Sequence, residues 1–288
     1  MILVTGASGN VGTQVVRRLA ERNIAVRAMT RNLPADGKVG TVEWVKGDFD
    51  DAASLARAMQ GVEKVVLISP AHADMLEHQS AVIDAAKAAG IKHIVKLSGL
   101  GASPDAPIRL PRLHHEIERR IVASGIAHTF VRPNLFMQAL LGSAETIRDD
   151  GAIYAPAGNG AISLTDVNDI ASVIVAAISQ AGHEGKAYDI TGPEALTYAQ
   201  MAETIGNALN APVQYIDVSL EVARDSMRAS GMGDWLVVAF LELFSIYRAG
   251  YGAAVFSDTV KQVTGHPANN FAAFMNTHKS VFGELKAA

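Results

Sequence analysis

The 288-residue chain contains no cysteine. That absence excludes disulfides, thiolate nucleophiles and cysteine-ligated zinc, and it favours a protein of the cell interior. An excess of positive charge is also missing, because 25 lysines and arginines stand against 29 acidic residues. Without a basic stripe or zinc-finger spacing, the chain has no field that would attract nucleic acid. Nucleic-acid binding is therefore disfavoured.

Long apolar runs are absent too. The longest, from Trp235 to Tyr247, is interrupted by Glu242 and is too short to cross a bilayer. The first predicted strand begins at Ile2, which leaves no room for a basic, apolar leader. We therefore expect a cytoplasmic protein that does not enter a membrane. The Trp235–Tyr247 run predicts a buried or lid helix, or alternatively a dimer surface.

What the first half does contain is a regular alternation of strands and helices. Short β-branched runs such as ILVT and VVLIS are separated by helical patterns. Strands separated by crossover helices predict an α/β fold with a doubly wound parallel sheet. Val11, Val15, Val16 and Leu19 fall on one stripe of the first helical segment, so this helix is expected to pack on the sheet.

The second half has a different rhythm. Residues 151–166 are glycine-rich with short strands, and Thr197 followed by Gln200 forms a capping-box pattern at the start of a helix. We predict a nucleotide-binding core over residues 1–150, with later strands interleaved. A smaller, mostly helical part over residues 151–288 is expected to close over it.

A glycine loop follows the first strand directly. In ILVTGASGNVGTQVV, Gly6, Gly9 and Gly12 stand between a strand and a helix. Glycines there let the chain turn sharply, let a pyrophosphate approach the backbone, and let the helix pack closely on the strand. The spacing is G-x-x-G-x-x-G rather than G-x-G-x-x-G, and a glycine turn without a ligand is the alternative. The strand before and the helix after favour a dinucleotide site.

These and later motifs resemble a known family. The segments TGASGNVG, KGDFDD, LSGLGA, VRPNLFMQ, DVNDIA and YDITGPEALTYAQMA are similar to the NmrA-like branch of the atypical short-chain dehydrogenase/reductases. The resemblance spans nearly the whole chain, including RAGYGAAV and TGHPANNFAAF. That branch includes NADPH-dependent quinone, azo-dye and triphenylmethane reductases and the NmrA redox sensor. The resemblance implies a Rossmann fold and an oxidoreductase, and it leaves the substrate open.

The end of the second strand indicates which dinucleotide binds. An acid there commonly bonds the ribose 2′-hydroxyl of NAD, whereas a 2′-phosphate needs a cation. The sequence has Thr30 and Arg31 without a carboxylate, so NADPH is expected, with Arg31 pairing with the phosphate. A solvated surface arginine is the alternative. Asp48 and Phe49 resemble the family's adenine-contacting pair, unless Asp48 only caps the helix that begins near Asp51.

The cofactor is expected to contact residues at several strand ends, because ligands of such sheets bind beyond the carboxyl ends of the strands. The predicted cofactor-binding residues are Thr5, Gly6, Ser8, Gly9, Asn10, Val11, Gly12, Thr30, Arg31, Asp48, Phe49, Ser69, Pro70, Ser98, His114, Pro133 and Asn134.

The superfamily's usual proton-donating pair is missing. In its classical members a Ser, then a Tyr with a Lys four residues on, activates a carbonyl. Registering that pattern on Glu118 puts Leu110 at the Tyr position and His114 at the Lys position. Without this pair, activation of a simple carbonyl is not expected. The reaction that remains is hydride transfer to conjugated acceptors, because water can protonate their reduced anions. Ser98, His114 and Glu118 are the catalytic candidates. We expect His114 and Glu118 to orient the nicotinamide ribose or to shuttle a proton. The alternative is that the two residues pair with each other in a purely structural role.

The acceptor pocket is predicted to be lined by Phe136, Met137, Trp235 and Phe240, with core packing the alternative for each. No metal site is expected around His114, because adjacent helical residues point to different faces. We therefore predict an NADPH-dependent reductase of quinone-like, azo or other aromatic small molecules. The alternative is a non-catalytic NADP(H)-binding sensor, and a homodimer is a further expectation.

Overall fold

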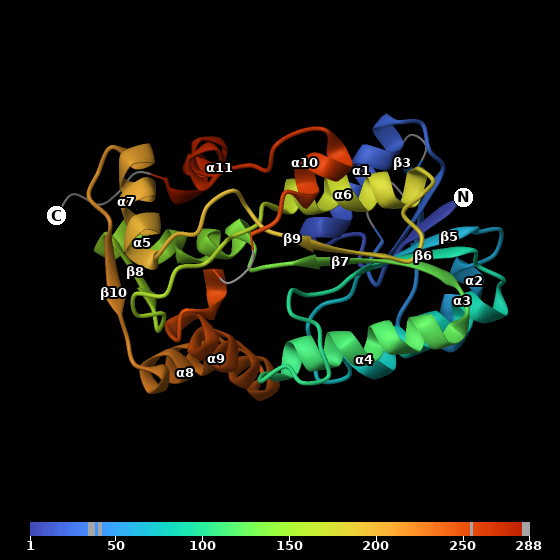
Figure 1. Ribbon diagram of the computed structural model, residues 1–288, viewed down its shortest axis with the longest axis horizontal. Coiled ribbons are helices and arrows are strands. Elements are labelled where there is room, and N and C mark those ends of the chain that lie inside the picture. Colours follow the sequence, from blue (N-terminus) through green and yellow to red (C-terminus); the bar gives the residue numbers. More distant parts are fainter. Residues whose placement is uncertain (34–37, 40–41, 254–255, 284–288) are drawn as a thin grey trace. The chain divides into compact units, whose positions relative to one another are not determined.

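The computed structural model describes residues 1–33, 38–39, 42–253 and 256–283 (Figure 1). The last two residues of the RAGYGAAV motif lie outside these ranges. The chain divides into two compact units, Met1–Pro133 with Val167–Asp189, and Asn134–Asp166 with Ile190–Ala288. In the first unit, the first segment ends at Pro133 rather than at residue 150, and the chain returns to this unit over Val167–Asp189.

The first unit is built on an eight-stranded sheet in the order β3-β4-β2-β1-β5-β6-β7-β9. Its strands are β1 (Ile2–Val4), β2 (Val26–Thr30), β3 (Lys38–Val39), β4 (Val42–Lys46), β5 (Lys64–Leu67), β6 (His93–Leu97), β7 (Ala127–Pro133) and β9 (Lys186–Ile190). Neighbours from β4 to β7 pair in parallel, and β3 is a short antiparallel strand at the edge. This order of parallel strands is that of the dinucleotide-binding fold, so the predicted doubly wound sheet is confirmed.

Helices cover both faces of the sheet (Figure 1). On one face α1 (Asn10–Glu21) packs against α6 (Val167–Ser179), and on the other α3 (Met75–Ala88) packs against α2 (Ala52–Ala58) and α4 (Arg109–Ser124). The four apolar residues predicted to face the sheet from α1 are all buried. Because α6 lies over β5, β6 and β7, it is almost entirely buried and apolar.

The second unit has a core of its own. The parallel strands β8 (Ala152–Ala155) and β10 (Gln214–Asp217) form a small sheet. Its helices are α5 (Ala144–Asp150), α7 (Tyr198–Leu209), α8 (Leu220–Ala229), α9 (Asp234–Arg248), α10 (Thr259–Thr264) and α11 (Phe271–His278), with 3-10 turns η1 (Met137–Ser143), η2 (Tyr251–Ala253) and η3 (Lys279–Phe282). The predicted capping box of Thr197 and Gln200 is present at the start of α7. Within the described ranges, no helix is both long and apolar enough to cross a membrane.

Candidate active site

The glycine loop between β1 and α1 is held by close backbone contacts. Gly6 has φ +57°, a left-handed conformation that favours glycine. A Cβ added to Gly12 would collide with the Gly6 carbonyl oxygen and lie 2.8 Å from the Ala7 Cα. A Cβ on Gly9 would meet only the Gly6 carbonyl oxygen, at 3.3 Å. Gly6 and Gly12 are therefore required by the loop itself, whereas Gly9 leaves its outer side open.

The start of α1 has the features that suit a bound anion. Its N-cap is Gly9, which has no side chain to bond the first-turn N–H groups, and the first turn contains no acid. Ser8, Gly9 and Asn10 are exposed. An uncapped helix N-terminus offers backbone donors and a positive dipole end to a phosphate. The loop therefore fits the pyrophosphate of a dinucleotide.

Two threonines support this loop from behind. The Thr5 hydroxyl donates to the Ile68 carbonyl oxygen at 2.7 Å and accepts from the Ile68 amide at 2.9 Å, which ties the end of β1 to the end of β5. The hydroxyls of Ser8 and Thr30 lie 3.3 Å apart.

Arg31 follows Thr30 directly and is exposed, and no hydrogen bond or ion pair joins its side chain to another described residue. Its guanidinium is therefore available to an anion at this strand end.

The segment after β4 shows whether Asp48 caps α2 or is open to contact an adenine. The residue that caps α2 is Asp51, whose carboxylate accepts from the Ser54 amide at 3.1 Å. Asp48 is exposed, and within the described part of the chain its carboxylate accepts only from the Asp50 amide, at 3.3 Å. Capping of α2 therefore does not occupy Asp48. Phe49 packs partly on the core and stacks on the ring of His78, with 5.7 Å between centroids.

A group of possible metal ligands lies beside this stack. His72, Asp74 and His78 bring ligand atoms within 4.8 Å of one another. The rings of His72 and His78 stack at 5.4 Å, and His78 Nε2 pairs with Asp50 at 3.1 Å. None of these four residues belongs to the predicted site, and His72 and Asp74 are exposed.

A buried ion pair lies where β6 and β7 end beneath α4. Glu118 of α4 accepts a hydrogen bond from the Ser98 hydroxyl at 2.6 Å and two from the Arg132 guanidinium at 2.9 and 2.5 Å. Ser98 and Glu118 are buried, at 5% and 3% exposed. The carboxylate raises the pKa of Arg132 and keeps that guanidinium charged. The structure therefore brings two of the catalytic candidates together, with Arg132 as an unpredicted third member.

His114 is held by a different partner. Its Nδ1 lies 2.9 Å from Nζ of Lys96, a β6 residue with 0% exposed surface, and the same Nζ donates to the Leu97 carbonyl oxygen at 3.1 Å. The opposite edge of the ring lies against Gly99: a Cβ there would be 2.8 Å from Cδ2 and 3.2 Å from Nε2. His114 is thus fixed between a buried lysine and a glycine.

The charges of this region explain its pKa shifts. Burial lowers the pKa of Lys96 to about 7, with Glu118 raising it and Arg132 lowering it by smaller amounts. Burial lowers the pKa of His114 well below its usual value, and the charges of Lys96 and Arg132 lower it further. His114 is therefore neutral at pH 7, and Lys96 titrates near neutral pH.

The expected pairing of His114 with Glu118 is not what holds the histidine. Among the described residues no hydrogen bond joins them, although they lie one turn apart on α4, because Glu118 is taken by Arg132 and Ser98. Lys96 was missed by the sequence analysis. The signal was present, because β6 is a central parallel strand, where apolar residues are usual, and a charged residue is almost never fully buried unless it has a partner.

The remaining predicted cofactor residues lie at strand ends with partners of their own. The Ser69 hydroxyl accepts from Gln79 Nε2 at 2.8 Å, Pro70 is exposed, and the Pro133 carbonyl oxygen accepts from the Leu100 amide at 3.0 Å. Asn134 is buried, and its amide nitrogen donates to Ser163 and to the Gly252 carbonyl oxygen. The Asn134 side chain therefore has an internal structural role in the second unit.

The predicted acceptor residues differ in accessibility. Met137 is 1% exposed and belongs to the core of the second unit, so its side chain is not open to a ligand. Phe136, Trp235 and Phe240 are partly exposed. Core packing, the alternative stated for all four, therefore applies to Met137.

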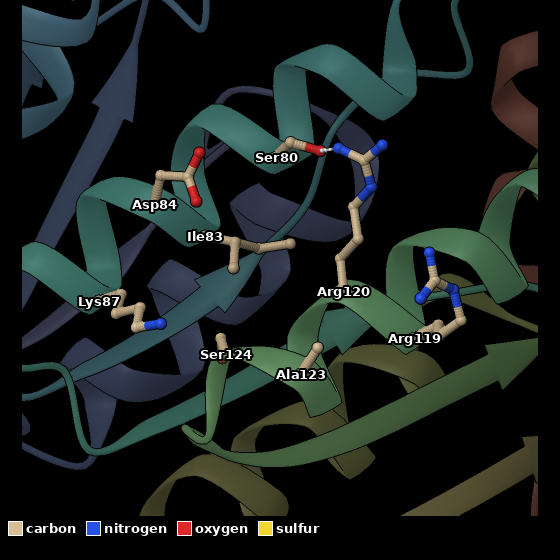
Figure 2. A pocket seen from close by; sticks show the side chains of 8 residues that line it. All are labelled: Ser80, Ile83, Asp84, Lys87, Arg119, Arg120, Ala123 and Ser124. Carbon is tan, nitrogen blue, oxygen red and sulfur yellow. Dashed lines mark hydrogen bonds between the residues drawn. The ribbon is translucent and has the colours of Figure 1, made fainter.

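A separate cavity of about 370 Å³ lies between α3 and α4 (Figure 2). It is lined by Ser80, Ile83, Asp84, Lys87, Arg119, Arg120, Ala123 and Ser124. No predicted cofactor, catalytic or acceptor residue is among them. The cavity is therefore distinct from the cluster around His114.

Comparisons with known proteins agree with this geometry. The NmrA-like family matches residues 1–259. An NAD(P)H azoreductase from Xenophilus azovorans is 40% identical over 98% of this chain and 99% of its own. The crystal structure of the NADPH-dependent quinone oxidoreductase QOR2 from Escherichia coli, complexed with NADPH, superposes with a TM-score of 0.86 at 31% identity, over 96% of this chain and 99% of that one. The Citrobacter sp. triphenylmethane reductase complexed with NADP(H) gives 0.82 at 25% identity, over 96% and 99% of the two chains. With this match over most of its length, the chain belongs to the NmrA-like family.

Proposed function

We propose that the protein is an NADPH-dependent reductase that transfers hydride to a quinone-like, azo or other conjugated aromatic acceptor. The observation that carries the proposal is the loop between β1 and α1, where a glycine N-cap and a first turn without acids suit a pyrophosphate. The azoreductase and quinone oxidoreductase relatives, which match nearly end to end, support the reaction class. NADPH supplies the hydride when it is bound.

Arg31 supports the choice of NADPH over NADH. It is exposed at the end of β2, where a 2′-phosphate would need a cation, and its neighbours in the sequence, Thr30 and Asn32, are not acids. Asp48 and Phe49 are proposed to contact the adenine, Asp48 through a carboxylate that does not cap α2. The contacts of the other loop residues with the cofactor stay predictions.

The acceptor class follows from what α4 lacks. Leu110 and His114 stand where a Tyr and a Lys would activate a simple carbonyl. A conjugated acceptor takes hydride without that activation, because its ring system delocalises the charge that develops. Phe136, Trp235 and Phe240 are proposed to contact such an acceptor, since flat apolar molecules bind to aromatic side chains.

The test is NADPH oxidation, followed optically, against a panel of quinones, azo dyes and simple ketones. We expect turnover with quinones or azo dyes and nearly none with ketones. The alternative is an NADP(H) sensor, favoured by the missing Tyr and Lys; tight NADPH binding with no turnover on the whole panel would replace the reductase with the sensor. A cytoplasmic location and a homodimer also stay predictions.

A further inference from the structure

The ammonium form of Lys96 fixes which ring nitrogen of His114 carries a proton. Nζ of Lys96 lies 2.9 Å from His114 Nδ1. In its ammonium form Lys96 has only donors, so below its pKa Nδ1 of His114 must accept, and the neutral imidazole then carries its proton on Nε2. The hydrogen bond to Lys96 therefore makes His114 a donor at its opposite edge.

That donor edge lies where a ligand of this fold is expected. Nε2 is the ring nitrogen next to Gly99, just beyond the carboxyl end of β6, and His114 keeps part of its surface accessible. Ligands of doubly wound sheets bind beyond this edge. The glycine also makes room for the ring, because a Cβ at residue 99 would press on Cδ2 at 2.8 Å.

The charged groups that face Lys96 come from two neighbouring elements. Glu118 approaches from α4 and Arg132 from β7, and these two are bound to each other by two hydrogen bonds. Glu118 raises the pKa of Lys96 and Arg132 lowers it, and burial is the largest cause of the Lys96 pKa of about 7. A group with a pKa near the working pH is suited to give and take back a proton.

We propose that Lys96 and His114 form a proton relay that protonates the acceptor after it has received hydride. The Nε2–H bond of His114 breaks as its proton goes to the reduced acceptor anion, and a proton from Lys96 Nζ forms a new bond at Nδ1. The acceptor has then gained a hydride and a proton, and Lys96 is left as a neutral amine. The pair is reset when a solvent proton enters at Nε2 and the Nδ1 proton returns to Nζ.

In this relay His114 is the catalytic residue, and Lys96 acts through it. The inference rests on the proposed reductase function. It assigns to a strand lysine and a helix histidine the proton delivery that a Tyr and a Lys perform in classical relatives of the superfamily.

The first test needs no turnover. Nitrogen NMR of ¹⁵N-histidine-labelled protein distinguishes a protonated ring nitrogen from a bare one. Below pH 7, where Lys96 is an ammonium, we expect His114 of the unaltered protein as the Nε2–H tautomer, and a changed tautomer ratio in Lys96→Met. Lys92→Met, which changes an exposed lysine beside β6, serves as the matched control and should leave the spectrum unaltered. A His114 found with its proton on Nδ1, or one indifferent to Lys96→Met, would overturn the relay.

The second test is kinetic. In single-turnover reduction of a quinone, Lys96→Met should lower the rate about 100-fold or more, within the range of general-acid catalysis, with little change in the KM for NADPH. The rate of the unaltered protein should fall as pH rises through about 7, because Lys96 loses its proton, and the variant should lose this dependence. A loss below about tenfold with an unchanged pH profile would mean that water protonates the acceptor.

The two tests separate this inference from the proposed function. If no acceptor on the panel oxidises NADPH, the reductase assignment fails, and the NMR result still decides how the pair is protonated. If quinones are reduced but Lys96→Met and Lys92→Met behave alike, the relay fails and the reductase stands. Should Lys96→Met not fold, Gly99→Ala displaces the His114 ring directly, with Gly142→Ala, which meets nothing within 4 Å, as its control.

Discussion

Two glutamates on α4 provide a sharp test of how burial sets the strength of an ion pair. Glu118 is 3% exposed and is bonded by Arg132 and Ser98. Glu118→Gln removes the charge but keeps the shape, leaving the Arg132 guanidinium without the carboxylate that bonds it. Breaking a buried pair in this way costs about 3–5 kcal/mol. Because the Arg132 side chain is 23% exposed and a glutamine oxygen still accepts, we expect a loss of about 2–4 kcal/mol in the free energy of unfolding.

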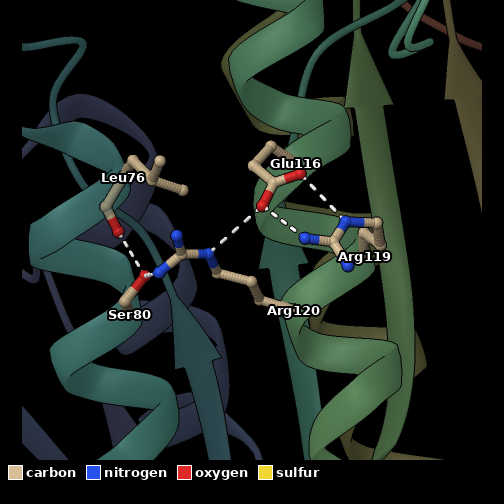
Figure 3. A network of polar contacts seen from close by, with 5 residues as sticks. All are labelled: Leu76, Ser80, Glu116, Arg119 and Arg120. Carbon is tan, nitrogen blue, oxygen red and sulfur yellow. Dashed lines mark hydrogen bonds and ion pairs between the residues drawn. The ribbon is translucent and has the colours of Figure 1, made fainter.

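Glu116 is the matched control, two residues earlier on the same helix. It accepts two hydrogen bonds from Arg119, at 2.9 and 2.7 Å, and one from Arg120 at 3.4 Å (Figure 3). These contacts lower the pKa of Glu116 to about 2. The guanidiniums are largely exposed, however, so water and salt screen the pair, and Glu116→Gln should cost less than about 1 kcal/mol.

Urea unfolding of both variants at pH 7, in low salt and again with 1 M NaCl, measures the difference. The screening length falls to about 3 Å in 1 M salt. The small Glu116→Gln effect should therefore vanish there, while the Glu118→Gln effect persists. An equal cost for the two substitutions, or a Glu118→Gln loss that salt abolishes, would refute the claim that burial decides the strength.

Three further predictions concern the loop, the cofactor and the buried lysine. The Gly9→Val variant should fold with a nearly unchanged melting temperature but show no NADPH binding by calorimetry. Gly12→Val should lower the melting temperature, because only the side chain at residue 12 collides with the loop's own backbone. An equal fall in melting temperature for the two variants would contradict this. Arg31→Glu should weaken NADPH binding by about 1–3 kcal/mol and invert the preference for NADPH over NADH. Equal affinities of the unaltered protein for the two cofactors would contradict the assignment of Arg31 to the 2′-phosphate. The pKa of Lys96 is about 7 when folded and about 10.4 when unfolded, so the unfolded chain binds more protons between these values and stability should rise with pH, by about 2 kcal/mol from pH 7 to 9. Urea titrations across that range should lose this rise in Lys96→Met but keep it in Lys92→Met.

The sheet and its first loop were predictable because their signals are local. The apolar stripe of α1 and the capping box of α7 depend on spacing within one helix, and both are present as expected. The antiparallel edge strand β3 is only two residues long and left no pattern.

The polar cluster was less predictable, because it depends on contacts between distant residues. Ser98, His114 and Glu118 were selected from a helix register and a strand end, and that register suggested a pair between His114 and Glu118. The actual partners, Lys96 and Arg132, come from β6 and β7. Which side chains meet across a sheet and a helix depends on the strand order and on how α4 lies over the sheet, and neither is visible in a local pattern.

The return of the chain to the first unit at α6 has a consequence for biosynthesis. This almost wholly buried helix covers β5, β6 and β7, yet it is made only after residues 134–166, which belong to the other unit. While the ribosome is still adding those residues, the part of this face formed by β5, β6 and β7 lacks the helix that covers it and presents apolar surface to the cell. The first unit is thus finished only when residue 189 has emerged, so chaperone occupancy of the nascent chain should be greatest before that point and fall after it.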